Sequence, residues 1–70
     1  MPFPATTSDI SVILDRLEKL PKIGQPLRAK PRLRETLFEI GRESAQKLGT
    51  PRSEIELLFR ARLREHLGRD

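Results

Sequence analysis

Two helices joined by a tight turn are predicted by the stretch Ala45-Gln46-Lys47-Leu48-Gly49-Thr50-Pro51-Arg52-Ser53-Glu54-Ile55-Glu56-Leu57-Leu58. Gly49 can adopt the left-handed backbone conformation that commonly ends a helix. Thr50 can then cap the following helix. Pro51 suits the first helical position, where its missing N–H would have had no intrahelical partner. The stretch therefore predicts one helix that ends at residue 48 and another that begins at residue 51.

Hydrophobic spacing on both sides of this turn predicts how far the two helices extend, because steps of three and four residues form one apolar stripe. The upstream helix, over residues 32–48, has the stripe Leu33, Leu37, Ile40, Ser44 or Ala45, and Leu48, with Phe38 beside it. The downstream helix, over residues 51–67, has the stripe Ile55, Leu58, Phe59, Leu63 and Leu67. Gly41 lies inside the upstream helix at a cost of about 1 kcal/mol relative to Ala, which close packing of another backbone would offset.

A further amphipathic helix is predicted over residues 8–20. Its apolar stripe is Ile10, Ile13, Leu17 and Leu20, and Thr7, Ser8 or Asp9 can cap its start. Pro21 disfavours helical geometry at Leu20, so the helix is expected to end there. Residues 1–7, which contain two prolines, are expected to form a flexible arm. The sequence thus predicts an all-α fold, a single three-helix domain over residues 8–70.

The connector between the first two helices, residues 21–31, is rich in proline and basic residues. Residues 27–33 alternate between apolar and basic side chains, which fits a short edge strand or, as we expect, an extended basic strap. Such a strap could release counterions from a phosphate backbone, although a solvated loop paired with nearby glutamates is the alternative. The candidate phosphate contacts are Lys22, Arg28, Lys30, Arg32 and Arg34.

Composition argues against several kinds of site. The 70 residues include no cysteine and one histidine, His66, so no metal or cofactor site is expected. His66 lies in the last turn of a predicted helix, where a protonated imidazole would favour the helix dipole. Short helices leave little room for a concave active site, so we do not expect an enzyme. No secretory signal or membrane-spanning run is found in the sequence, which favours a cytoplasmic protein.

The third predicted helix has more apolar surface than so small a core can cover. Leu57 and Ala61 form a second apolar edge beside its core stripe. A domain of this size without disulfides or metal usually gains stability from a partner subunit. We therefore predict a homodimer, or contact with another protein, through Leu57, Leu58 and Ala61.

The segment 45–58 resembles the helix-turn-helix of bacterial DNA-binding proteins. Ala45 matches the small residue four positions before the turn glycine, and Gly49 matches that glycine. Ile55 and Leu58 match the apolar positions that bury the second helix. The resemblance implies that the helix starting near Pro51 enters the major groove and presents Arg52, Ser53, Glu56 and Arg60. Glu54 and Glu56 depart from it by placing negative charge near phosphates.

Residues 27–67 also resemble the ribbon-helix-helix repressors, which are dimers that lay a two-stranded ribbon in the major groove. That resemblance implies a strand in which Arg28, Lys30 and Arg32 point to bases, and an inter-helix turn over residues 49–55. Pro31 and Phe59 depart from the pattern of the family.

Two functional hypotheses follow. The first is a small, basic DNA-binding regulatory protein, which would suit a net charge of +4 and ten arginines among fourteen basic residues. The second is a protein–protein adaptor or small subunit that binds its partner through apolar helix edges, its charges serving for solubility.

Overall fold

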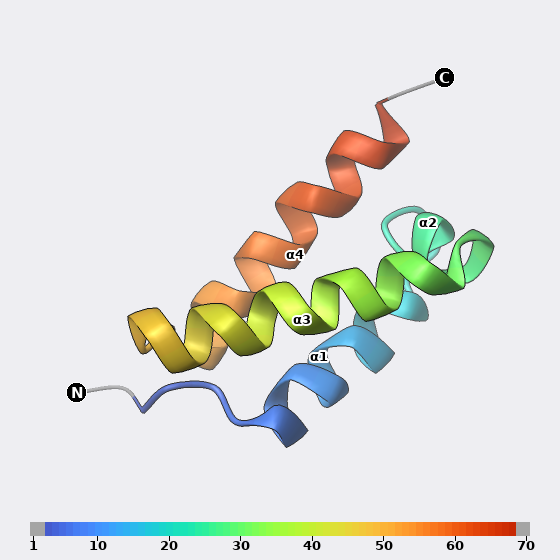
Figure 1. Cartoon of the computed structure of the whole chain (residues 1–70). Helices are drawn as coiled ribbons and strands as arrows, with labels where there is room; N and C mark the ends of the chain where they lie inside the picture. The colour runs from blue at the N-terminus through green and yellow to red at the C-terminus, as the bar shows by residue number, and fades with distance from the viewer. Residues whose placement is uncertain (1–2, 69–70) are drawn as a thin grey trace.

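The computed structural model describes residues 3–68, and these form four helices (Figure 1). Helix α1 spans Thr7–Glu18, α2 Gln25–Ala29, α3 Pro31–Leu48 and α4 Arg52–Leu67. No strand is present within this described range, so the predicted all-α class is confirmed. The three predicted helices are found close to their predicted bounds, and α2 is an additional element.

Helix α1 begins one residue earlier than predicted because its cap is Thr6. The hydroxyl of Thr6 accepts a hydrogen bond from the backbone N–H of Asp9 at 3.0 Å. In return, the Asp9 carboxylate accepts one from the backbone N–H of Thr6, also at 3.0 Å. This reciprocal capping box satisfies two backbone donors that the helix itself leaves unpaired. Just before it, Ala5 is buried and donates its N–H to the carbonyl of Thr50 at 2.9 Å, which ties the N-terminal segment to the α3–α4 turn.

The expected extended connector is wrong, because residues 25–29 form α2 and α3 already begins at Pro31. Pro26 and Pro31 each occupy the first turn of a helix, where a missing N–H costs nothing. Lys30 alone is extended between them. The alternating residues 27–33 do not form a strand. Leu27 lies in α2 and packs into the core, where it is 3% exposed.

The turn between α3 and α4 follows the predicted chemistry at Gly49 but differs at Thr50. Gly49 takes the left-handed conformation with φ 65° and ends α3 as expected. The hydroxyl of Thr50 donates to the carbonyl of Ser44 at 3.1 Å, so Thr50 closes the end of α3 and does not cap α4. Helix α4 consequently starts at Arg52, with Pro51 before it in extended conformation.

The core lies where α1, α3 and α4 meet, with one residue from α2. Phe59 of α4 packs at the centre over Gly41 of α3, and a Cβ atom on Gly41 would approach the Phe59 ring to 2.7 Å. A close approach is therefore found at Gly41, but it is made by an aromatic side chain and not by another backbone. Leu48, predicted to be buried, is 80% exposed because it is the last residue of α3, and the buried face of that helix ends at Ala45. The buried apolar residues are Ala5, Ile10, Ile13, Leu14, Leu17, Leu27, Leu37, Ala45, Ile55, Phe59 and Leu63.

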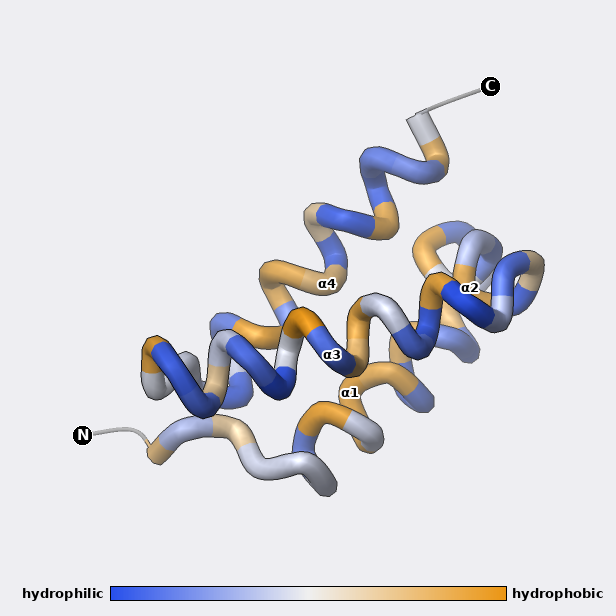
Figure 2. The backbone as a smooth tube through the Cα atoms, in the orientation of Figure 1, coloured by the Kyte–Doolittle hydropathy of each residue, from blue (hydrophilic) through white to orange (hydrophobic). Residues whose placement is uncertain are grey.

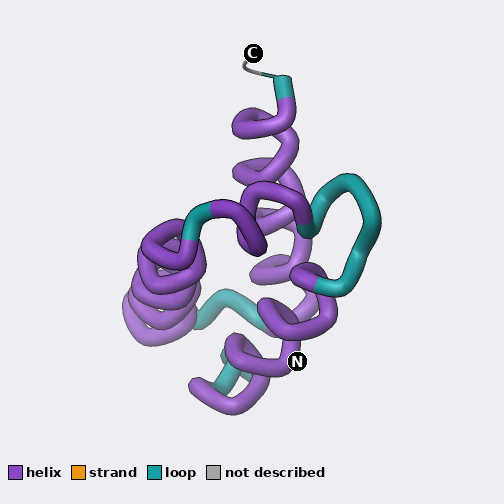
Figure 3. The backbone as a smooth tube through the Cα atoms, turned by 90° about the vertical axis from the view of Figure 1, so that its right-hand side faces the viewer, coloured by secondary structure: helices purple, strands orange, loops and turns teal. Residues whose placement is uncertain are grey.

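The molecule is elongated, 39 × 19 × 18 Å along its principal axes. Helices α3 and α4 diverge from their common turn, so the last turns of α4 rise away from the body (Figure 1). The hydrophobic positions in that projecting part are separated by hydrophilic ones (Figure 2). Viewed from the side where α2 lies, α3 is seen nearly end-on and α4 rises above α2 (Figure 3).

Candidate nucleic-acid interface

Positive charge is concentrated at one end of the molecule. We call this the basic end, comprising residues 19–34 (the α1–α2 connection, α2 and the start of α3) and residues 61–68 (the last part of α4). It holds eight basic residues and one acidic residue. The remainder of the described chain, residues 3–18 and 35–60, holds five basic and eight acidic residues. The net charge of +4 therefore understates the excess of basic residues in these two ranges.

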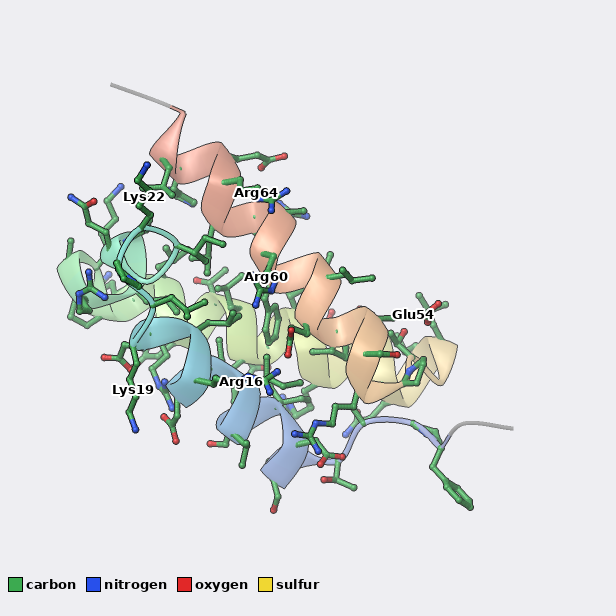
Figure 4. All side chains as sticks on the ribbon, turned by 180° about the vertical axis from the view of Figure 1, so that it is seen from behind. Arg16, Lys19, Lys22, Glu54, Arg60 and Arg64 are labelled. Atoms are coloured by element: carbon green, nitrogen blue, oxygen red, sulfur yellow. The ribbon has the colours of Figure 1, made fainter. Side chains whose placement is uncertain are left out.

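Most basic residues of this end have no carboxylate partner within residues 3–68. Six of the eight are exposed and form no ion pair within residues 3–68, so their charges are available to an external anion. Figure 4 shows Lys22 on the α1–α2 connection and Arg64 on α4 in the upper part of the view, whereas Lys19 extends from the end of α1 in the opposite direction. The full set is Lys19, Lys22, Lys30, Arg32, Arg62 and Arg64.

Arg28, predicted to contact phosphate, has a structural role in this fold. Its guanidinium donates hydrogen bonds to three backbone carbonyls, those of Glu18 at 2.7 Å, Leu20 at 2.9 Å and Pro21 at 3.1 Å. These carbonyls lie at and beyond the end of α1, where helical acceptors lack partners. The short helix α2 brings Arg28 back to them, so its side chain closes the α1–α2 connection.

Arg34, another predicted phosphate contact, is neutralised within the fold. Its guanidinium lies 2.7 Å from the Asp15 carboxylate and 3.2 Å from that of Glu18. Both acids belong to α1, so Arg34 joins α3 to α1. Of the five predicted connector contacts, Lys22, Lys30 and Arg32 remain unpaired among the described residues.

A groove lies between the start of α3 and the last turn of α4. Lys30, Pro31, Arg32, Leu33 and Thr36 line one side, and His66 lines the other. Its wall is mainly apolar, and the two cations are its charged members. His66 is half-buried there, in the last turn of α4 as expected.

The predicted recognition surface at the start of α4 lies at the opposite end. Arg52 and Ser53 are both exposed there, beside a groove that also involves Phe3, Pro51 and Leu57. The hydrogen bonds from Thr6, above all that of its backbone N–H, hold the pKa of Asp9 below its ordinary value of 3.8. The positive charge of Arg52 contributes less. The acidic side chain of Asp9 therefore lies near Arg52.

Arg60, predicted to reach base edges, is engaged with Glu56. Its Nε lies 3.4 Å from the Glu56 carboxylate, which also pairs with Arg16 of α1. Figure 4 shows Arg16 and Arg60 extending from α1 and α4 toward the same region. Glu56 therefore joins α1 to α4, and it is not a free side chain that faces outward to DNA.

The predicted interface residues on α4 differ in exposure. Leu57 is 65% exposed and Ala61 is also exposed, whereas Leu58 is partly buried and packs against the core of its own chain. Leu57 and Phe3, which is 89% exposed, line the same groove.

Lys19, Arg62 and Arg64 belong to the basic end but are not among the contacts predicted from the sequence. The signal available was the three arginines at alternate positions 60, 62 and 64, but the topology that brings the end of α4 beside α2 could not be inferred from it. No group of three or more His, Cys, Asp or Glu side chains within residues 3–68 is placed to hold a metal ion. None of the helices in this range is long and apolar enough to cross a membrane.

No protein family, curated protein or solved structure was found to match this chain.

Proposed function

We propose that the protein binds DNA through its basic end, which contacts the phosphate backbone. The observation that supports this is the group of six exposed basic residues at the basic end, Lys19, Lys22, Lys30, Arg32, Arg62 and Arg64, which form no ion pair within residues 3–68. Cations without internal partners gain most from meeting phosphates, because binding releases condensed counterions and breaks no existing ion pair. Arginine and lysine at this end come from three separate parts of the chain, namely the α1–α2 connection, the start of α3 and the last part of α4.

The start of α4 offers a weaker surface for DNA. Asp9 and Glu54 place acidic groups near Arg52 and Ser53, and like-charge repulsion between these carboxylates and phosphates would oppose the binding of DNA there. The 18-residue α3 separates the two ends by about 27 Å, given a rise of 1.5 Å per residue. The two surfaces can therefore be tested separately by mutation.

The experiment is fluorescence anisotropy of a labelled duplex titrated with the protein at about 50 and about 200 mM salt. If four or five basic residues contact phosphates, the rise in salt concentration across this range should weaken binding on the order of a hundredfold. Lys30→Glu with Arg32→Glu should weaken binding at least about tenfold and reduce the salt slope by about 2. Glutamate in the first turn of α3 is compatible with the helix dipole, so the fold should persist.

The matched control is Lys47→Glu with Arg52→Glu, which makes the same change of charge at the other end. Both residues are exposed and have no ion pair within residues 3–68. We expect this variant to bind close to the original affinity. A larger loss in the control than in the Lys30/Arg32 variant would transfer the contact surface to the helix-turn-helix-like corner and contradict the proposal.

An adaptor or homodimer remains the alternative, favoured by the exposed Leu57 and Phe3 at the end opposite the basic end. Exposed large apolar side chains that share a groove are typical of interaction sites. Under this alternative, Leu57→Glu abolishes self-association or partner binding in sedimentation velocity, while the Lys30/Arg32 variant behaves as the original protein. Absence of DNA binding at low salt together with that result would establish the adaptor.

A further inference from the structure

We infer that the groove between α3 and α4 holds an unstacked base. The basic end would then bind single-stranded DNA through a base as well as through phosphates, and more tightly than it binds a strand that has phosphates but no bases. This inference rests on the proposed function and specifies its ligand. The groove combines two features that a phosphate contact does not need: a shallow, mainly apolar wall and a heterocyclic side chain, His66.

The chemistry of the groove matches one nucleotide unit. Lys30 and Arg32 are exposed cations on the α3 side, and Pro31 and Leu33 supply apolar surface between them. A nucleotide has the same two parts, a charged phosphate and a base with a broad apolar face. Proteins that bind single strands pair a positive track with flat side chains on which bases stack.

A duplex cannot use the groove in this way, because its bases are stacked and paired inside the double helix. An unpaired base can turn outward and lie against a side chain such as His66. Helix α4 holds His66 opposite the first turns of α3, so the imidazole and the apolar wall lie on two sides of one space. Arg62 lies four residues before His66 and so on the same face of α4, where its exposed charge extends the positive surface along which the strand would continue.

The test compares two fluorescein-labelled single strands of equal length with the intact protein. One is a run of thymidines, and the other has the same number of phosphates but abasic sugars. Phosphate contacts alone predict equal affinities. Stacking of one base predicts tighter binding of the thymidine strand by about fivefold to a hundredfold. Equal affinity would overturn the inference and leave the DNA-binding proposal intact, whereas no binding of either strand or of a duplex at low salt would overturn both.

A pair of variants tests the part played by the imidazole. His66→Ala should lower the affinity for the thymidine strand toward that for the abasic strand, without changing the latter. His66→Phe keeps a flat ring and should retain the preference. Circular dichroism melting of both variants separates a loss of fold from a loss of stacking. A thymidine preference that is unchanged in a folded His66→Ala variant would contradict the assignment of this groove.

Discussion

The two ends of this molecule present opposite kinds of surface, although the same two helices reach both. At the basic end, cations are exposed and unpaired within the described chain, and apolar side chains line a groove between them. At the other end, which we call the turn end (residues 3–9 and 47–57), Phe3 and Leu57 are exposed and basic and acidic residues are mixed. The two ends of α3 therefore differ in the balance of charge and in the exposure of large apolar side chains, and the core lies between them.

The contact of Phe59 with Gly41 holds both ends in place, so breaking it should produce the largest effect. Phe59→Ala should cost about 3–5 kcal/mol of unfolding free energy, since it removes a fully buried aromatic ring. A 70-residue domain has little more stability than that, so both surfaces should be lost together. Urea unfolding measures the change. Leu57→Ala, two residues away and exposed, should shift stability by no more than about 0.5 kcal/mol. Similar losses in the two variants would contradict the packing.

The basic end alone should be disrupted by Gly24→Ala. A Cβ atom there would lie 2.4–2.6 Å from the backbone carbonyl oxygens of Glu18, Leu17 and Leu20, which cannot move without distorting the end of α1. Overpacking of this kind typically costs about 1–3 kcal/mol. Gly68→Ala is the control, because its nearest non-neighbouring atom lies at 3.5 Å, an ordinary contact. Thermal unfolding of the two variants should differ by that amount, and equal stability would show that the α1–α2 connection is looser than described.

Arg28 and Arg32 lie four residues apart at the basic end, and their removal should have different consequences. Arg28→Met removes three hydrogen bonds to backbone carbonyls and should cost about 1 kcal/mol, a modest value because the side chain is exposed. Arg32→Met should leave stability almost unchanged. Hydrogen exchange in residues 19–24 should accelerate in the first variant only. Acceleration in both, or in neither, would contradict the structural role of Arg28.

The helices were predictable because their signals are local. Apolar spacing and the turn chemistry of Gly49 depend on a few neighbouring residues, and both predicted elements that flank the turn are found. The connector was not, because proline carries two opposite meanings. In an extended strap it stiffens the chain, and in the first turn of a helix it fits without cost. Residues 27–30 contain no proline, so the backbone hydrogen bonds of a short helix can form between Pro26 and Pro31, and this was the available signal for α2.

The candidate site was predictable only as a list of basic residues. Whether an arginine is free depends on which acids the fold brings beside it. Arg34 meets carboxylates of α1 that lie 16 and 19 positions away in the sequence. Arg28 meets carbonyls that only α2 could bring within reach. The groove lined by His66 joins residues more than 30 positions apart, and no sequence spacing signals such a contact.

The smallest expected effect belongs to Asp9 at the turn end. Because hydrogen bonds from Thr6 lower the pKa of Asp9 in the folded protein, the ionised carboxylate stabilises the fold. That contribution is fully present above 3.8, the ordinary pKa, and is lost as the pH falls through the lowered value. Asp9→Asn should therefore melt at a lower temperature than the original protein at neutral pH, and the gap should narrow at acidic pH. Melting curves of both proteins between about pH 7 and about pH 2.5, a range that spans ordinary aspartate titration, would measure it. A difference in melting temperature that stays constant across this range would show that the charge of Asp9 does not stabilise the helix cap. The turn end would then differ from the basic end in its exposed surface and not in its response to acid.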